Sequence, residues 1–120
     1  MPLDRSDIEA LLPLQPATFH ILVSLAAEEL HGYAIILDIE QRTEGALRLS
    51  AGTLYRSIKR MLEQGLIVES TRRPPPPTDD ERRRYYRITP FGTAVARAET
   101  KRLAELVRMA RAHGLTPLTP

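Results

Sequence analysis

The spacing of apolar residues predicts a mainly helical chain that carries one hairpin. Apolar positions recur every three or four residues, the period of a helix, in five stretches bounded mostly by proline or glycine. These predicted helices span residues 6–12, 17–29, 33–43, 50–64 and 90–113. Between the last two, residues 66–73 and 82–89 are rich in residues that favour strands. A chain of 120 residues with this pattern forms one domain.

The fourth predicted helix has two contrasting sides. Read at about 100° per residue, its apolar residues gather on one side: Leu54, Ile58, Met61 and Leu62. The opposite side carries Arg56, Lys59 and Arg60. Ser50 is a favourable N-cap and Gly65 a favourable C′ residue, after which the chain turns back toward the helix. The pattern predicts a helix that packs on a core and presents cations to an anionic partner.

Positive charge is concentrated in the middle of the chain. The whole chain carries a net charge of only +2, but residues 48–87 hold ten basic and five acidic residues. That segment therefore carries +5 and the rest of the chain −3. A basic region on one part of a domain is typical of proteins that bind phosphate groups along nucleic acid. A solvated charged surface is the alternative interpretation.

The predicted hairpin follows the cationic helix directly. Helix, strand, turn, strand is the order of a winged helix-turn-helix, so we expect a mainly α fold with a two-stranded β wing. The prolines at 74–77 have no N–H to donate, and Asp79, Asp80 and Glu81 near the tip would repel phosphate. The contact group is therefore predicted at the base of the wing: Arg73, Arg82, Arg83 and Arg84. A disordered loop with flanking charges is the alternative for the tip.

The two ends of the chain predict an assembly surface. Residues 6–12 read as a short helix whose Ser6 and Glu9 have the spacing of a capping box. The last helix carries one apolar patch around Val95 and another around Leu106, more than a small core buries. We expect a second copy of the chain to cover the excess, with packing between the two ends of one chain as the alternative. The predicted dimer contacts are Ile8, Leu11, Leu12, Val95, Leu103, Leu106, Val107 and Ala110.

Several functional classes find no support in the residues. The chain has no cysteine, and His20, His31 and His113 lack the spacing of metal ligands, so no metal or cofactor is expected. No nucleophile elbow or glycine-rich phosphate loop is present, which argues against an enzyme. Aromatic residues, which stack single-stranded RNA bases, make up only 5%. No apolar run reaches the roughly 18 residues of a membrane span, so a cytoplasmic location is expected.

The sequence resembles the PadR family of bacterial and archaeal transcriptional regulators. The resemblance rests on HGYAIILDIE at 31–40, SAGTLYRSIKRMLEQGLIVES at 50–70 and RRYYRITPFG at 83–92. The short C-terminal arm is similar to that of the compact subfamily, in which one long helix forms the dimer. The resemblance implies residues 1–89 as the DNA-binding domain, 90–114 as the dimerisation helix and 115–120 as a tail. It further implies a homodimer that binds a palindromic operator, usually as a repressor.

Family positions that face DNA match residues of this chain. The resemblance assigns DNA contact to Ser50, Thr53, Tyr55 and Lys59 and close approach of the backbone to Gly52. Arg56 stands where proline is common in the family, and therefore adds a contact of its own. With those named above, the predicted DNA contacts are Tyr33, Ser50, Gly52, Thr53, Tyr55, Arg56, Lys59, Arg60, Arg73, Arg82, Arg83 and Arg84.

Two questions stay open at this level. Some compact relatives bind flat aromatic drugs between tryptophans at the dimer interface, but this chain has no tryptophan. The resemblance therefore names no small-molecule effector for it. The alternative to DNA binding is a winged helix used only for protein–protein contact, which would bind its partner without sensitivity to salt.

Overall fold

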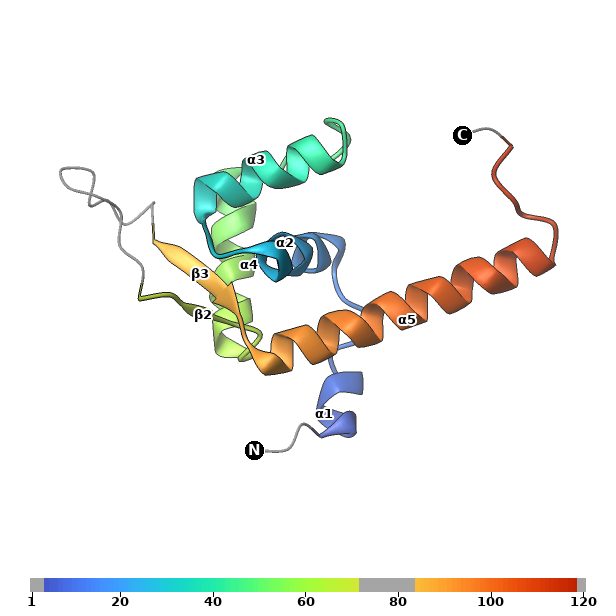
Figure 1. Cartoon of the computed structure of the whole chain (residues 1–120), viewed down its shortest axis with the longest axis horizontal. Coiled ribbons are helices and arrows are strands. Elements are labelled where there is room, and N and C mark those ends of the chain that lie inside the picture. Colours follow the sequence, from blue (N-terminus) through green and yellow to red (C-terminus); the bar gives the residue numbers. More distant parts are fainter. Residues whose placement is uncertain (1–3, 72–83, 119–120) are drawn as a thin grey trace.

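Helices dominate the fold, with one small antiparallel sheet. The computed structural model describes residues 4–71 and 84–118, and Figure 1 shows their arrangement. Its elements are α1 (Arg5–Glu9), α2 (Pro16–Ala27), β1 (Leu30–His31), α3 (Gly32–Arg42), α4 (Ala51–Glu63), β2 (Ile67–Glu69), β3 (Tyr85–Ile88) and α5 (Pro90–Ala112). The predicted mainly α fold of the winged-helix type is confirmed. The wing tip, including Asp79, Asp80 and Glu81, lies outside the described residues.

The core lies where α2, α3 and α4 meet the sheet (Figure 1). Its fully buried side chains come from all of these elements and from the start of α5: Ile21, Leu22, Ile35, Ile39, Leu54, Met61, Leu66, Ile67 and Val95. Branched and straight aliphatic side chains fill it, and Tyr86 is the aromatic residue in the buried cluster. Burial of this apolar surface fixes the three helices relative to one another.

The caps predicted for α4 are confirmed. The Ser50 Oγ accepts a hydrogen bond from the Thr53 amide at 3.1 Å. Gly65 adopts a positive φ of 76°, and the Leu66 amide donates to the Met61 carbonyl at 3.0 Å, as in a Schellman C-cap. Leu62, however, was predicted on the buried side and is 38% exposed. It lies at the edge of the apolar stripe, beyond the reach of the core.

The sheet contains a third strand, β1, that the sequence pattern did not reveal. The strand order is β1-β3-β2, with Leu30 opposite Tyr86 and Ile67 opposite Ile88. β1 has only two residues, too few to show any alternation of apolar and polar positions. Of the tyrosines in β3, Tyr86 is buried and Tyr85 is half-buried, consistent with the predicted alternation.

The buried side of α3 was predicted wrongly. A helical wheel predicts that Tyr33, Ile36, Leu37 and Glu40 share one side of α3, with Ile35 and Ile39 widening it. Tyr33 and Leu37 are nevertheless 61% and 46% exposed, whereas Ile35 and Ile39 are fully buried. α3 carries apolar residues on several sides, so packing against α2 and α4 decides which side is covered.

The first helix is shorter than predicted and begins at a different cap. The Asp4 carboxylate accepts from the Ser6 amide at 2.9 Å, so Asp4 caps the helix and the proposed Ser6–Glu9 capping box is wrong. The helix ends at Glu9. Ile8, Leu11 and Leu12 are partly buried against the core cluster, and α1 contacts α5.

The last helix is half buried and half exposed along its length. Thr89 caps it, with the Gly92 amide donating to its Oγ1 at 2.9 Å. Val95 is fully buried in the core of its own chain, so its predicted place in a dimer interface is wrong. The second half of the helix extends away from the other elements (Figure 1). There Leu106, Val107 and Met109 are 47%, 52% and 46% exposed.

Candidate nucleic-acid interface

Three cations occupy the exposed side of α4. Arg56, Lys59 and Arg60 are all exposed, and none of them forms an ion pair within residues 4–71 and 84–118. By contrast, Arg42, Arg48 and Arg102 each lie within 3.2 Å of a carboxylate oxygen. The side of α4 that points away from the core therefore carries positive charge that no acid of the described chain neutralises.

The start of α4 is open to solvent. Besides capping the helix, Ser50 donates through Oγ to the Thr53 Oγ1 at 3.1 Å, and Arg56 donates to the same Thr53 oxygen at 3.4 Å. A Cβ added to Gly52 would meet only the Arg56 Nη1 at 3.3 Å and the Ser50 Oγ at 4.0 Å. Both neighbours are the ends of side chains that can move, so the fold itself does not require glycine at 52.

The tyrosines predicted to contact DNA differ in their surroundings. Tyr55 is half-buried and packs against the core, with its hydroxyl 2.5 Å from the position that a Cβ on Gly32 would occupy. Gly32 thus makes room for Tyr55, which supports the start of α3. Tyr33 is exposed on the surface at that same start. Tyr33 therefore has the accessibility that a DNA contact needs, whereas Tyr55 is largely committed to packing.

His31 positions the start of α3, a role that the sequence pattern did not reveal. Its Nδ1 accepts a hydrogen bond from the Ala34 amide at 3.1 Å, so the imidazole is the N-cap. The Tyr85 ring meets the His31 ring edge-on, with centroids 5.4 Å apart. The wing strand β3 is thereby joined to the helix that precedes α4. Histidine is not among the usual N-cap residues, so no sequence signal marks this cap.

The base of the wing is described only in part. Arg84 is exposed, and its Nε lies 3.7 Å from the Glu69 Oε1 on the neighbouring strand. Both side chains are solvent-accessible, so this ion pair is weak and exchangeable. Arg73, Arg82 and Arg83 lie outside the described residues.

A polar cluster fixes α3 against α2. The Ser24 Oγ donates to the Asp38 Oδ2 at 2.6 Å, and Arg42 donates to the Ser24 Oγ at 2.7 Å and to the His20 carbonyl at 2.9 Å. The Ser24 hydrogen bond lowers the pKa of Asp38, with the Arg42 charge adding to it. Burial lowers the pKa of His20, whose Nδ1 is buried without a partner among the described residues. Ser24 donates to Asp38 and not to His20, so this is a packing network and no catalytic dyad.

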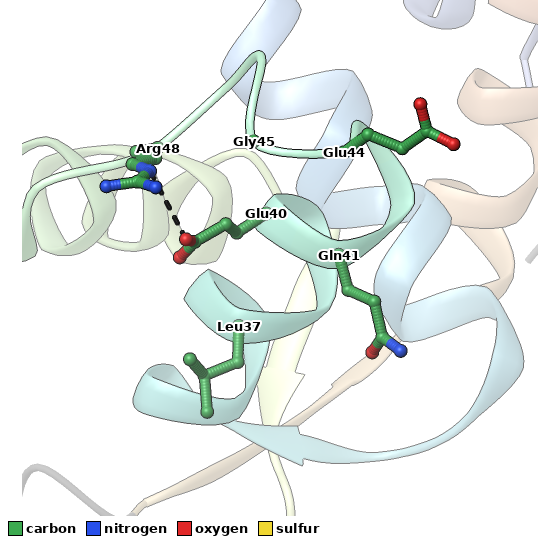
Figure 2. A pocket seen from close by; sticks show the side chains of 6 residues that line it. All are labelled: Leu37, Glu40, Gln41, Glu44, Gly45 and Arg48. Atoms are coloured by element: carbon green, nitrogen blue, oxygen red, sulfur yellow. Dashed lines mark ion pairs between the residues drawn. The ribbon is translucent and has the colours of Figure 1, made fainter.

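Two hollows flank the helix-turn-helix, and they differ in charge. One, of about 590 Å³, lies on the outer side of α3, where Glu40 points toward Arg48 at 3.2 Å and Glu44 points away (Figure 2). The other is a groove of about 330 Å³ between the start of α2 and the side of α4. It is lined by Gln15, Thr18, Thr53, Arg56, Ser57 and Arg60. The first hollow is acidic, and the second contains no acid.

Metal-ligand clusters and membrane-spanning helices are both absent from the described residues. No three His, Cys, Asp or Glu side chains there lie close enough together to hold a metal ion. No helix in the same part of the chain is both long and apolar enough to cross a membrane.

Known proteins share both the sequence pattern and the fold. The sequence model of the Transcriptional regulator PadR-like family matches residues 21–98. Transcriptional regulator Rv3488 of Mycobacterium tuberculosis is 35% identical over 89 residues, which cover 74% of this chain and 77% of that protein. The chain belongs to the PadR-like family of transcriptional regulators. The matched region contains α3, α4 and the wing strands, which carry the candidate interface, and also the first part of α5.

Solved structures of PadR-like and other regulators share this fold. A transcriptional regulator from Clostridium thermocellum superposes with a TM-score of 0.66 at 23% identity, covering 96% of this chain and all (100%) of the other. For a PadR family regulator from Clostridium difficile, the TM-score is 0.67 at 21% identity, and the match covers 82% of this chain and 98% of the other. For Bacillus subtilis PadR in complex with operator DNA, the TM-score is 0.61 at 20% identity, and the match covers 72% of this chain and 46% of the other.

Proposed function

We propose that this PadR-like chain represses transcription by binding a palindromic DNA operator as a homodimer. The observation that carries the proposal is the exposed side of α4, where Arg56, Lys59 and Arg60 have no acidic partner within the described chain. Unpaired cations on an exposed helix attract the phosphates of duplex DNA and release its counterions. The existence of a Bacillus subtilis PadR complex with operator DNA supports the same partner.

In the proposed complex, α4 enters the major groove. Ser50 and Thr53, at its N-terminus, bind a backbone phosphate, which the helix dipole favours. Arg56 and Lys59 reach base edges, with arginine to guanine as the specific contact. Further contacts to the backbone come from the remaining proposed residues: Tyr33, Gly52, Arg60, Arg73, Arg82, Arg83 and Arg84. Tyr55 supports the start of α3 from within.

The proposed dimer forms through α5. Leu106 and Val107 are exposed on the part of this helix that extends beyond the core, with Leu103 and Ala110 partly buried beside them. An exposed apolar helix side of this kind is stabilised by a copy of itself around a twofold axis. Residues 90–114 then form the dimerisation helix, 1–89 the DNA-binding domain and 115–120 a tail. Two α4 helices about 34 Å apart would read successive major grooves, which explains a palindromic site.

A selection from random duplex DNA, followed by binding at several salt concentrations, tests the proposal. The wild-type protein should enrich a palindrome, and its affinity should fall steeply as salt rises. Lys59→Ala should weaken binding and lower the salt slope by about 1. Lys101→Ala is the matched control, because Lys101 is an exposed lysine on α5, away from the interface. Salt-insensitive partner binding, or equal behaviour of the two variants, would favour the protein-interaction alternative.

A further inference from the structure

The groove between α2 and α4 has the composition of an anion site. Its polar lining consists of two arginines, three hydroxyl groups and one amide: Arg56, Arg60, Thr18, Thr53, Ser57 and Gln15. Each of these groups can donate a hydrogen bond, and no carboxylate lines the groove. The hollow on α3, by comparison, is lined by Glu40 and Glu44 and would repel an anion.

The start of α2 adds free backbone donors to this groove. Gln15 occupies the N-cap position but makes no side-chain cap hydrogen bond. The amides of Ala17 and Thr18 in the first turn therefore lack a capping acceptor, and the helix dipole places partial positive charge there. An anion seated in the groove would supply the missing acceptor.

The Thr18 hydroxyl adds a further donor to the groove. Thr18 is only 8% exposed as a residue and lines the groove. Within residues 4–71 and 84–118, its side chain forms no hydrogen bond, and its hydroxyl is not one of the fully buried atoms that lack a partner. The hydroxyl of this otherwise buried residue therefore opens onto the groove, where an anion can accept its hydrogen bond.

We propose that this groove binds a phosphate of the DNA backbone, at the edge of the duplex that α4 reads. The inference rests on the proposed function, because α4 supplies both arginines of the groove. Arg60 would bind the phosphate from one side, and the start of α2 would bind it from the other. Arg56, which reaches base edges in the proposed complex, would add positive charge beside the groove. The contact would anchor α2, a helix with no predicted part in DNA binding, and would fix the angle at which α4 enters the major groove.

Substitution of Gln15, the N-cap residue of α2, distinguishes phosphate binding in the groove from an effect on helix stability. Aspartate is a better N-cap than glutamine, so Gln15→Asp should leave the melting temperature unchanged or raise it. The same carboxylate would occupy the groove and repel phosphate. Affinity for the selected operator duplex should fall about tenfold, and the salt slope should fall by about 1. Gln15→Asn caps the helix without charge and should weaken binding less.

Gln41→Asp is the matched charge control, because it makes the same change on exposed α3, beside the acidic hollow. If Gln15→Asp and Gln41→Asp bind the operator equally, the groove site is wrong. If the wild-type protein selects no duplex at all, the proposed function fails instead. Thr18→Val, which keeps the shape but removes the hydroxyl, should also weaken binding several-fold.

A second measurement distinguishes a backbone phosphate from a free one. The amide resonances of Ala17 and Thr18 should shift on addition of the operator duplex, and the shift should be absent in Gln15→Asp. Shifts with millimolar inorganic phosphate, together with unchanged operator affinity in Gln15→Asp, would overturn the backbone assignment.

Discussion

Helices α4 and α5 begin alike and end in different surroundings. Each starts at a hydroxyl cap, Ser50 or Thr89, that accepts from the third following amide. α4 buries its apolar side along its length and exposes cations. α5 buries its apolar side only near its start, and its second half exposes Leu106 and Val107. An exposed cationic side is soluble by itself, whereas an exposed apolar side is stabilised by a further protein surface.

This difference matches the two roles proposed for the helices, DNA reading for α4 and assembly for α5. The buried apolar residues of α4 all pack in the core of their own chain. The apolar residues in the outer half of α5 have no such packing within one chain. The two helices meet where Gly92 packs on the Leu66 carbonyl, directly after the C-cap of α4. A rigid contact here would hold the reading helix at a fixed angle to the proposed dimer axis.

The largest expected effect is on the outer half of α5. In a symmetric dimer, Leu106→Glu replaces one apolar side chain by a charge in each of the two chains. The loss of both leucines should weaken dimerisation by about 4 kcal/mol, roughly a thousandfold in the dissociation constant. Analytical ultracentrifugation should show a monomer with unchanged helical circular dichroism. Lys101→Glu, a larger change of charge on the opposite side of the same helix, should remain a dimer. A Leu106→Glu protein that stays dimeric would show that α5 does not form the interface.

The junction of the two helices should be the next most sensitive point. A Cβ at Gly92 would overlap the Leu66 carbonyl oxygen and would lie 2.9 Å from the Ile88 Cγ1. Backbone atoms must then move, so Gly92→Ala should lower the free energy of unfolding by about 2–3 kcal/mol. Urea denaturation measures this. Gly52→Ala is the control, since it meets no backbone and should not destabilise the fold.

Two ion pairs on α5 sharpen the contrast between its halves. Both join a glutamate to the arginine three residues later, but the Glu99 side chain is 2% exposed and the Glu105 side chain 51%. Glu99 also accepts from the Leu14 amide at 3.0 Å, which ties the α1–α2 linker to α5. Glu99→Gln should lower the free energy of unfolding, measured by urea denaturation, by about 2 kcal/mol. Glu105→Gln should lower it by less than about 0.5 kcal/mol.

The Glu99 contribution should depend on pH. Hydrogen bonding from Arg102, followed by that from Leu14, lowers the pKa of Glu99 below its ordinary 4.5. A carboxyl group with a lowered pKa in the folded state stabilises the protein above its unfolded pKa. That contribution is lost as the pH falls from 4.5 through the folded pKa. The gap in stability between wild type and Glu99→Gln should therefore be full at neutral pH and shrink in acid; an equal gap at both would contradict the assignment.

The smallest expected effect concerns Gly52. Alanine there should raise the stability of α4 by up to about 1 kcal/mol, because alanine is the better helix former. Operator affinity should nonetheless fall about fivefold if the DNA backbone approaches this glycine closely. Fluorescence anisotropy with the selected duplex measures the change. Unchanged affinity would remove Gly52 from the proposed interface and leave the rest of α4 in place.

Local chemistry made α4 predictable. Ser50 and Gly65 mark its ends through hydrogen bonding and backbone freedom, properties that belong to single residues. The start of α5 at Thr89-Pro90 was predictable for the same reason. His31 was not, because histidine is not among the usual N-cap residues and its ring contact is with Tyr85, far away in the sequence.

The candidate site likewise has a part that was predictable from local sequence and a part that depended on the fold. The cations of α4 were visible in the sequence because a helical period sorts them onto one side. Only the fold revealed that these cations have no acidic partner among residues 4–71 and 84–118, and that α2 forms a donor-lined groove with them. Nothing in the sequence indicated that Gln15 and Thr18 line a groove, because the other side of that groove is α4, which starts more than thirty residues later.

The sequence alone determined both ends of α4 and the start of α5, which residues carry charge and which family the chain resembles. These follow from the dihedral preferences and hydrogen-bonding groups of neighbouring residues. Only the tertiary structure decided that Tyr33 and Leu37 face solvent, that Val95 belongs to the core and that β1 completes the sheet. A helix with apolar residues on several sides has no preferred inside until neighbouring elements pack against it, because burial depends on the partners present.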